Sequence, residues 1–428
     1  MKERSFFKTS MTFMSIFIAL LLLSACDNEQ TVQHISIKPL ENVVYTGEPV
    51  TFCILENIPQ NVEVKWAFAD VNWYHGDTTF YNTHEVTQTF SDPGIYHIAL
   101  CLKTNCGFTK SSSAIVRVYN KGDKIIPQVI LDTDARNEID DQHFIAYALY
   151  SELDVLAITS IHNKEDFSEP ENYGEIYHVL QKMWYSDYPK ETPVVYHGAT
   201  HMLERPESGI WLDTKPIVTE ASNAILAAAR GASPGNPVYV LPVGPGTNVA
   251  SAILQAEKEG FDINGRIKVL GLIGGPKSVN ENTYNGRNDP WSVYVIGESG
   301  IDFTLILEHP SGASLAFVKA EDANRYPENK IGKYLQTIML NRLAGGHYTN
   351  DTKSLYDLST ISAVISEHLN LGWLTEVEDM NIADIDKIYT WQKTGEKSNV
   401  HIVWDIDEQA MKTDFFHTLN GNPRQLMK

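Results

Sequence analysis

Cysteine and positive charge are both scarce in this 428-residue sequence. One of its four cysteines, Cys26, ends an N-terminal targeting segment, and the three that are left are an odd number, which excludes a complete disulfide framework. Cys101 and Cys106 are close enough in sequence for a hairpin to place them opposite each other, and a disulfide between them is left open. With 34 basic against 54 acidic residues, the formal charge of −20 argues against nucleic-acid polymers and anionic membranes as partners. The fourteen histidines show no spacing typical of a zinc site.

The N-terminus has the pattern of a targeting segment. An apolar run at residues 11–23 follows the basic residues Lys2, Arg4 and Lys8, and residues 23–26 read Leu-Ser-Ala-Cys. This ending resembles the lipobox at which bacterial lipoproteins are cleaved and acylated. We therefore predict that residues 1–26 are a lipoprotein signal peptide with Cys26 as the lipidation site, and that a lipid anchor holds the protein at the outer membrane, on the cell surface or in the periplasm. A plain signal peptide and an uncleaved anchor are the alternatives.

Residues 31–120 predict an all-β module. Short alternating runs such as those at residues 62–66 and 96–100 are separated by turns rich in Gly, Pro and Asn, at the spacing of a β-sandwich. The segments at residues 46–52, 66–68 and 90–96 resemble the PKD family of immunoglobulin-like modules. That resemblance implies a spacer or adhesion module rather than a catalytic one, with a linker at residues 121–124.

From residue 125 onward, strand and helix patterns alternate. Apolar runs at residues 155–160, 193–198, 238–243, 267–273 and 303–307 are separated by helical segments. Such alternation predicts an α/β domain over residues 125–428, with a mostly parallel sheet and helices on both faces. Ligands of open α/β sheets bind at the carboxyl ends of the strands, so the residues that follow these runs are the candidate site residues.

Four aspartates crowd the turn that follows the first of these strands. Residues 129–131 form a buried-strand run, Asp132 and Asp134 follow directly, and Asp140 and Asp141 come just before a helical segment. Carboxylates packed this closely repel one another, and a hard divalent cation such as Ca²⁺ or Mg²⁺ relieves the repulsion. The alternative is an acidic, solvated loop with an N-cap aspartate.

The Asp-Thr-Asp at residues 132–134, followed by Asp140 and Asp141, resembles the metal-binding signature that opens the inosine/uridine-preferring nucleoside hydrolase family. The linker at residues 135–139 is longer here than in that family and carries Arg136 and Glu138. Further motifs resemble the family in the expected order. They are Gly-Pro-Gly-Thr-Asn at residues 244–248, Ile-Gly-Gly at 273–275, Tyr-Asn at 284–285, Asp-Pro at 289–290 and Tyr-Asp at 356–357.

The resemblance implies a set of site residues. Asp134, Asp141, Asp357 and the backbone carbonyl of Val243 would hold Ca²⁺, and Asp134 would also be the catalytic base. Asp140, Asn163 and Asn285 would bind the sugar. Tyr356 stands where many members have a histidine that assists the departing base, and it is the second candidate catalytic residue. Thr283 stands where the family has a glutamate that helps to hold the sugar.

The resemblance implies a Ca²⁺-dependent hydrolase, outside the cytoplasm, that cleaves the N-glycosidic bond of ribonucleosides or related ribofuranosyl compounds. Two alternatives stay open. A surface-tethered glycosidase would release pentofuranosyl units from glycans, and a non-catalytic carbohydrate-binding protein would retain the metal site alone. The expected partner is a small nucleoside or furanosyl sugar, and self-association into a homo-oligomer is left open.

Overall fold

The computed structural model describes residues 37–39, 43–54, 64–69, 85–104, 107–163, 168–186, 192–274, 276–278, 281–307, 315–345, 351–382, 391–394 and 397–427. The chain divides into two compact units, residues 1–121 and 122–428. The predicted signal peptide with Cys26, and Cys106 of the disulfide left open above, lie outside the described residues. Among the helices that are described, none is both long and apolar enough to cross a membrane.

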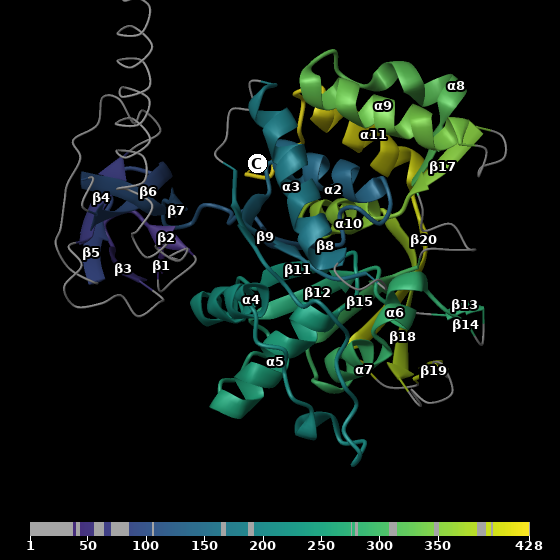
Figure 1. The fold of residues 1–428 in the computed structure, drawn as a ribbon, viewed down its shortest axis with the longest axis horizontal. Helices are drawn as coiled ribbons and strands as arrows, with labels where there is room; N and C mark the ends of the chain where they lie inside the picture. The colour runs from purple at the N-terminus through teal and green to yellow at the C-terminus, as the bar shows by residue number, and fades with distance from the viewer. Residues whose placement is uncertain are drawn as a thin grey trace, which may run out of the picture. The chain divides into compact units, whose positions relative to one another are not determined.

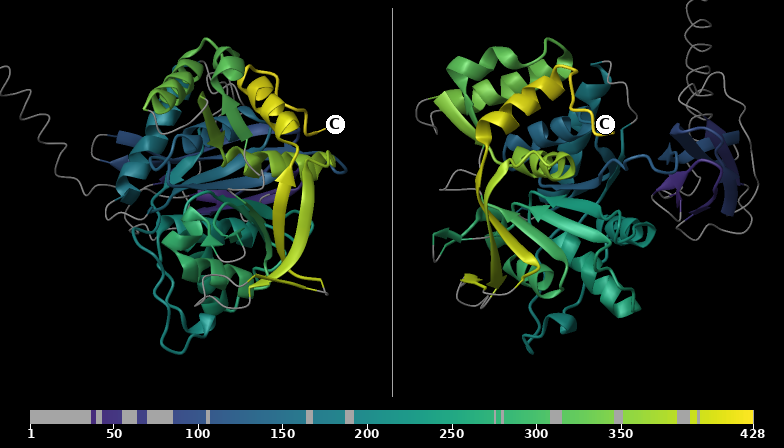
Figure 2. Two further views of the ribbon diagram at one scale, coloured as in Figure 1. Left: turned by 90° about the vertical axis from the view of Figure 1, so that its right-hand side faces the viewer. Right: turned by 180° about the vertical axis from the view of Figure 1, so that it is seen from behind.

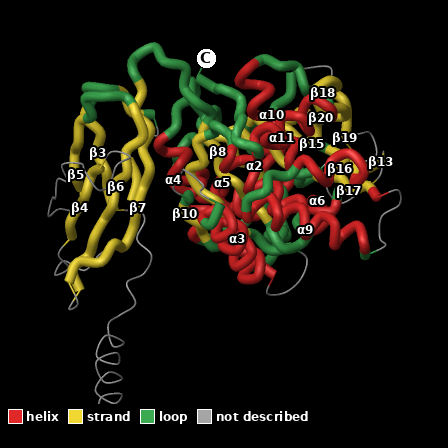
Figure 3. The backbone as a smooth tube through the Cα atoms, turned by 90° about the horizontal axis from the view of Figure 1, so that it is seen from above, coloured by secondary structure: helices red, strands yellow, loops and turns green. Residues whose placement is uncertain are grey.

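The first unit is built from strands alone in the part that is described. One sheet contains β1 (Ile37–Pro39), β3 (Pro49–Ile54) and β5 (Glu85–Thr89), and the other contains β2 (Val44–Tyr45), β7 (Gly107–Tyr119), β6 (Gly94–Thr104) and β4 (Val64–Ala69). Phe52, Trp66 and Leu100 from both sheets are fully buried in its core. Figure 3 shows these strands in yellow. The prediction of an immunoglobulin-like sandwich is confirmed.

The second unit is organised around a nine-stranded sheet (Figure 1). In spatial order its strands are β10 (Val194–Tyr196), β9 (Asp154–Ser160), β8 (Gln128–Thr133), β11 (Val238–Pro242), β12 (Ile267–Gly271), β15 (Asp302–Ile306), β20 (Val400–Ile406), β18 (Leu374–Ile382) and β19 (Trp391–Lys393). Neighbouring strands from β10 to β20 are parallel, and β18 and β19 add an antiparallel edge. The prediction of a mostly parallel sheet is confirmed.

Helices cover both faces of this sheet (Figures 1 and 2). On one side lie α2 (Asp140–Tyr150), α3 (Ser168–Trp184), α9 (Lys330–Ala344), α10 (Leu358–Leu369) and α11 (Glu408–Leu419). On the other lie α4 (Glu220–Gly231), α5 (Thr247–Glu259) and α7 (Pro290–Glu298). Every residue of β8 is buried, which is why its middle, residues 129–131, reads as an apolar run with no polar face.

Short elements complete the second unit. They are η1 (Trp211–Asp213), α6 (Tyr284–Asn288), α8 (Lys319–Asp322), η2 (Ala323–Arg325) and the strand pairs β13 (Pro276–Ser278) with β14 (Glu281–Asn282) and β16 (Leu315–Val318) with β17 (Thr352–Leu355). The sheet order places β8 between β9 and β11, so the residues that follow these three parallel strands meet at one edge. This edge holds the aspartates singled out in the sequence.

Candidate active site

The turn from β8 to α2 buries three of the predicted aspartates. The Asn137 N–H donates to the carbonyl of Asp134 at 2.8 Å and closes the turn, and Asp140 and Asp141 form the first turn of α2. All three residues are at most 3% exposed. The helix dipole favours negative charge at that position, but it cannot compensate several buried carboxylates.

Asp357 joins this cluster from the start of α10. It occupies the N-cap position, yet its side chain makes no capping hydrogen bond, so helix capping does not explain an aspartate there. Carboxylate oxygens of Asp140, Asp141 and Asp357 lie within 4.8 Å of one another. Residues more than two hundred positions apart therefore form one acidic site.

Asp134 belongs electrostatically to the same cluster. Burial raises its pKa well above the ordinary value, and the neighbouring carboxylates of Asp141 and Asp140 raise it further. Burial and the same neighbours also raise the pKa of Asp141 and Asp357. Both oxygens of Asp134 and Oδ1 of Asp140 are buried without a hydrogen-bond partner. Unpaired buried carboxylate oxygens that repel one another fit a hard divalent cation, which takes oxygen ligands.

The Val243 carbonyl and Asn285 lie next to this cluster. A Cβ atom on Gly244, the residue after Val243, would lie 3.1 Å from Cβ and Cγ of Asp134, so the turn after β11 contacts Asp134 directly. The Asn285 amide Nδ2 donates to the Val243 carbonyl at 2.5 Å and to the Leu272 carbonyl at 3.0 Å. A carbonyl oxygen has two lone pairs, so that of Val243 can accept from Asn285 and still serve as a ligand.

Tyr356 and Lys353 flank Asp140. The Tyr356 N–H donates to Oδ2 of Asp140 at 3.1 Å, and Lys353 Nζ lies 3.6 Å from Oδ1. The same ammonium is 3.7 Å from Oε2 of Glu138 and lies over the Tyr356 ring, 5.1 Å from its centroid. Lys353 did not figure in the sequence analysis, because no motif surrounds it. The only available signal was the excess of carboxylates, which calls for a cation nearby.

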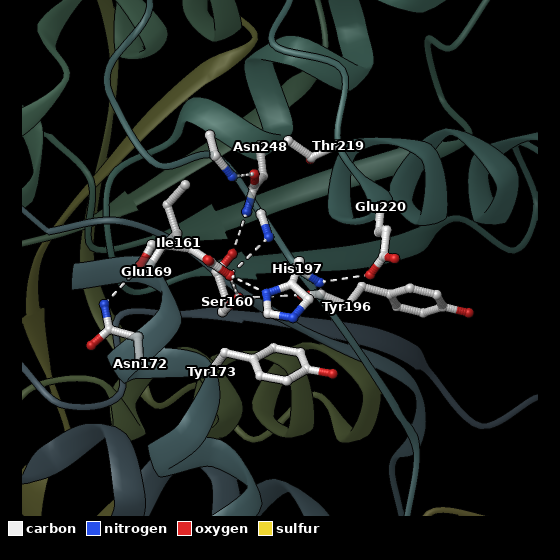
Figure 4. A network of polar contacts seen from close by, with 12 residues as sticks. Ser160, Ile161, Glu169, Asn172, Tyr173, Tyr196, His197, Thr219, Glu220 and Asn248 are labelled. Atoms are coloured by element: carbon white, nitrogen blue, oxygen red, sulfur yellow. Dashed lines mark hydrogen bonds and ion pairs between the residues drawn. The ribbon is translucent and has the colours of Figure 1, made fainter. Parts of the chain in front are cut away.

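Asn163 follows β9 at the same sheet edge, where a hydrogen-bond network holds the neighbouring backbone (Figure 4). Its N–H donates to Ser168 Oγ at 2.9 Å. The buried Glu169 accepts from Ser160 Oγ, from His197 Nδ1 at 3.0 Å and from the Gly198 N–H at 3.2 Å. The network ties α3 to the ends of β9 and β10 and thereby places Asn163.

Two known protein families match parts of this chain. A sequence model described as inosine-uridine preferring nucleoside hydrolase matches residues 129–413, and one of the PKD domain matches residues 34–117. The chain belongs to the inosine-uridine preferring nucleoside hydrolase family. As a member, it is a hydrolase acting on N-glycosyl compounds, and its family is metal-dependent.

Solved nucleoside hydrolases share the fold. A plant nucleoside hydrolase, the PpNRh1 enzyme, is 20% identical, with a TM-score of 0.52 over 69% of this chain and 99% of that one. An inosine-guanosine nucleoside hydrolase is 16% identical, with a TM-score of 0.52 over 70% of this chain and 98% of that one. At these identities the likeness shows the fold alone. No curated protein matches the chain.

A polar layer holds Asp132 next to the acidic cluster of this nucleoside hydrolase domain. Its Oδ1 accepts from Thr159 Oγ1 at 2.7 Å and from Asn248 Nδ2 at 2.8 Å, and its Oδ2 is buried without a hydrogen-bond partner. Burial raises the pKa of Asp132 to about 7. The roles of Thr159 and Asn248 were missed in the sequence, where Asn248 stood only in the Gly-Pro-Gly-Thr-Asn motif and had no partner assigned.

The longer β8–α2 linker of this nucleoside hydrolase domain carries two charged side chains with separate partners. Arg136 forms an ion pair of 2.9 Å with Glu171 on α3, and both side chains are exposed. Glu138 pairs with Arg342 of α9 and lies near Lys353. The linker is therefore tied to α3, α9 and β17, and Arg136 is engaged at the surface.

Proposed function

We propose that this protein is a Ca²⁺-dependent nucleoside hydrolase that cleaves the N-glycosidic bond of ribonucleosides outside the cytoplasm. The observation that carries the proposal is the buried aspartate cluster at the carboxyl edge of the sheet. Both oxygens of Asp134 and Oδ1 of Asp140 are buried there without a hydrogen-bond partner. Burial and the neighbouring carboxylates raise the pKa of Asp134, Asp141 and Asp357. A buried cluster of this kind is costly to the fold, so a functional ligand is the best explanation for it.

Asp134, Asp141, Asp357 and the Val243 carbonyl would hold the cation. All four supply oxygen and none supplies nitrogen or sulfur, which favours Ca²⁺ over zinc. When bound, the cation lowers the pKa of water and attracts the vicinal hydroxyls of the sugar.

The chain's own residues then divide the remaining work. Asp134 accepts a proton from the attacking water as general base. Asp140 accepts hydrogen bonds from the furanose hydroxyls, and Asn163 and Asn285 help to orient the ring, so that the water faces the anomeric carbon. The bond between that carbon and the base breaks through an oxocarbenium-like transition state, and the base leaves with the bonding electrons.

Tyr356 is the candidate donor to the leaving base. Its phenol has a reference pKa of about 10, so it transfers a proton less readily than an imidazole would. This residue also supports the second candidate function, a glycosidase that releases pentofuranosyl units from glycans. A sugar leaving group takes its proton on the glycosidic oxygen, whereas a purine takes it on a ring nitrogen. The non-catalytic alternative is disfavoured because the chain belongs to a hydrolase family and keeps Asp134, the proposed general base, which a pure sugar binder does not need.

The location is proposed from the N-terminal sequence. Cleavage before Cys26 and acylation of its sulfur would leave the mature protein anchored by lipid. Replacing Cys26 with alanine should move the protein from the membrane fraction to the soluble fraction. Recovery of both forms in the membrane fraction would argue for an uncleaved anchor.

A substrate panel tests the function directly. Inosine, uridine, nitrophenyl β-D-ribofuranoside and nitrophenyl α-L-arabinofuranoside are incubated with the protein in millimolar Ca²⁺, and release of base or nitrophenol is measured. We expect the protein to cleave both the nucleosides and the nitrophenyl riboside. The nitrophenyl riboside should be cleaved faster, because its leaving group needs no proton. Cleavage of the arabinofuranoside alone would support the glycosidase, and no cleavage at all would support the binder. Tyr356→Phe should slow inosine more than the nitrophenyl riboside.

A further inference from the structure

Lys353 is a buried lysine at the edge of the acidic site. It lies on β17, where burial alternates, so Lys353 and Leu355 face inward while Thr352 and Ser354 are partly exposed. The residue is only 3% exposed. A lysine is rarely buried to this extent unless its charge is paired, so its partners indicate why it is there.

The partners of Lys353 come from two segments, the β8–α2 turn and β17 with the residue that follows it. Its Nζ donates to the Ser354 carbonyl at 2.6 Å, and it lies 3.6 Å from Oδ1 of Asp140 and 3.7 Å from Oε2 of Glu138. It also lies over the ring of Tyr356, 5.1 Å from the centroid. An ammonium over an aromatic face is attracted by the ring quadrupole.

These contacts fix the orientation of Asp140. Its two oxygens face different partners, the Tyr356 N–H at Oδ2 and Lys353 at Oδ1. Lys353 is itself held, because Glu138 is anchored on its other side by Arg342 of α9. The lysine also acts at a distance on the cluster, since its charge opposes the upward shift in the pKa of Asp357.

We propose that Lys353 is a positioning residue that fixes the Asp140 carboxylate and the Tyr356 ring, and thereby sets the affinity for the furanose. The proposal rests on the proposed function, in which Asp140 binds the sugar. Lys353 itself touches no reacting atom. Without the charge of Lys353, Oδ1 of Asp140 loses its ion-pair partner and the carboxylate is no longer held in one orientation, so sugar binding weakens more than the chemical step.

The test is a set of variants with steady-state kinetics on inosine at saturating Ca²⁺. Lys353→Met should raise KM at least tenfold and change kcat less than threefold. Lys353→Arg, which keeps the charge, should recover most of the loss. Lys319→Met is the matched control, because Lys319 lies after the partner strand β16 and forms only an exposed ion pair with Asp351 at 3.4 Å. It should leave both constants unchanged.

A double-mutant cycle separates positioning from general structural damage. In the Asp140→Asn background, Lys353→Met should change kcat/KM by less than twofold, because the group through which the lysine acts is already altered. Equal fold losses in both backgrounds would overturn the proposal. If Lys353→Met does not fold, Lys353→Gln takes its place in the cycle.

Calorimetric titration of D-ribose gives a second readout that needs no turnover. Tenfold weaker binding to Lys353→Met than to the wild type and Lys319→Met supports the proposal, and equal binding to all three overturns it. A wild type that binds ribose but cleaves no nucleoside contradicts the proposed function alone. A wild type that neither binds ribose nor cleaves nucleosides overturns both the role of Lys353 and the proposed function.

Discussion

Asp134 is the residue on which the proposed chemistry depends most, because it is assigned both to the cation and to the water. Asparagine has the same shape but cannot accept the proton, and it removes one charge from a crowded cluster, so the fold should persist. We expect Asp134→Asn to lower kcat on inosine by at least about a hundredfold, the scale of acid–base and metal-assisted catalysis. The measurement is initial rates together with circular dichroism of both proteins.

Asp132→Asn is the matched control for Asp134. Asp132 lies two residues away, and its Oδ1 is held by Thr159 and Asn248. We expect it to cost less than about tenfold, since the acid–base group is kept. A mild effect of Asp134→Asn would place the base elsewhere, with Glu138 as the nearest further carboxylate on the same linker.

Residues could be assigned from the sequence where a motif surrounded them. Asp134, Asp141 and Asp357 stand in recognisable short patterns, and the structure brings them together at one sheet edge. Their catalytic and ligand roles stay predictions. Lys353 and Glu169 could not be assigned, because their importance comes from partners distant in sequence: Asp140 for the first, Ser160 and His197 for the second. Such contacts exist only once the sheet order is known.

At the scale of elements, the turn after β11 is packed tightly against the β8–α2 turn. An alanine Cβ at position 244 would lie 2.6 Å from Cγ2 of Ile161 and 3.1 Å from Cγ of Asp134. We therefore expect Gly244→Ala to lower the free energy of unfolding by about 1–3 kcal/mol, the usual cost of overpacking. The expected displacement of Val243 should also weaken Ca²⁺ binding, measured as the shift in melting temperature with added Ca²⁺.

Gly174→Ala in α3 is the control for this substitution. A Cβ at that position meets nothing within 4 Å, and alanine favours a helix over glycine, so stability should stay the same or rise. Equal stability of Gly244→Ala and the wild type would show that the two turns are not packed as described.

The pH dependence of stability tests the electrostatics of the β8–α2 turn and α10. The folded-state pKa values of Asp134, Asp141 and Asp357 are raised above their unfolded values, near 3.9. The folded protein then holds more protons at these three groups, so their contribution to stability without a cation is fully present below about pH 4 and is lost as the pH rises towards neutrality. Bound Ca²⁺ should offset this loss.

The measurement is the melting temperature of chelated protein with and without millimolar Ca²⁺ at pH 4.5 and pH 7. We expect a larger increase at pH 7, where the cluster is more fully ionised and metal ligands are deprotonated. The same increase at both pH values would count against the carboxylate cluster as the binding site.

The main elements were predictable to different degrees. Six of the parallel strands, from β10 to β15 in the sheet, were found because they are largely buried on both faces and read as apolar runs, as in β8 and β11. The parallel strand β20 and the antiparallel strand β18 were not found, because charged residues such as Asp405 in β20 and Glu376 in β18 interrupt their apolar patterns. Charges near the edge of a sheet discourage pairing with other chains, but they also hide a strand from a search for apolar runs.

At the scale of the whole molecule, the two units have separate hydrophobic cores, and all the proposed site residues belong to the second. A truncated chain that begins at Gly122 should therefore keep its kcat/KM on a small soluble nucleoside within about twofold, a change of less than half a kcal/mol in transition-state binding. The comparison uses the truncated and mature chains at equal concentrations of folded protein. Loss of most activity in a well-folded truncation would assign the PKD domain a part in catalysis.

The most direct measurement is the release of hypoxanthine from inosine by chelated protein as Ca²⁺ is added back. We predict no measurable release in excess chelator, and recovery that saturates with Ca²⁺ over the same concentrations that raise the melting temperature. Asp134→Asn should show little recovery at any concentration. Full activity in excess chelator would contradict the claim that the buried aspartates hold a catalytic cation. So would an inactive wild type whose melting temperature does not change when Ca²⁺ is added.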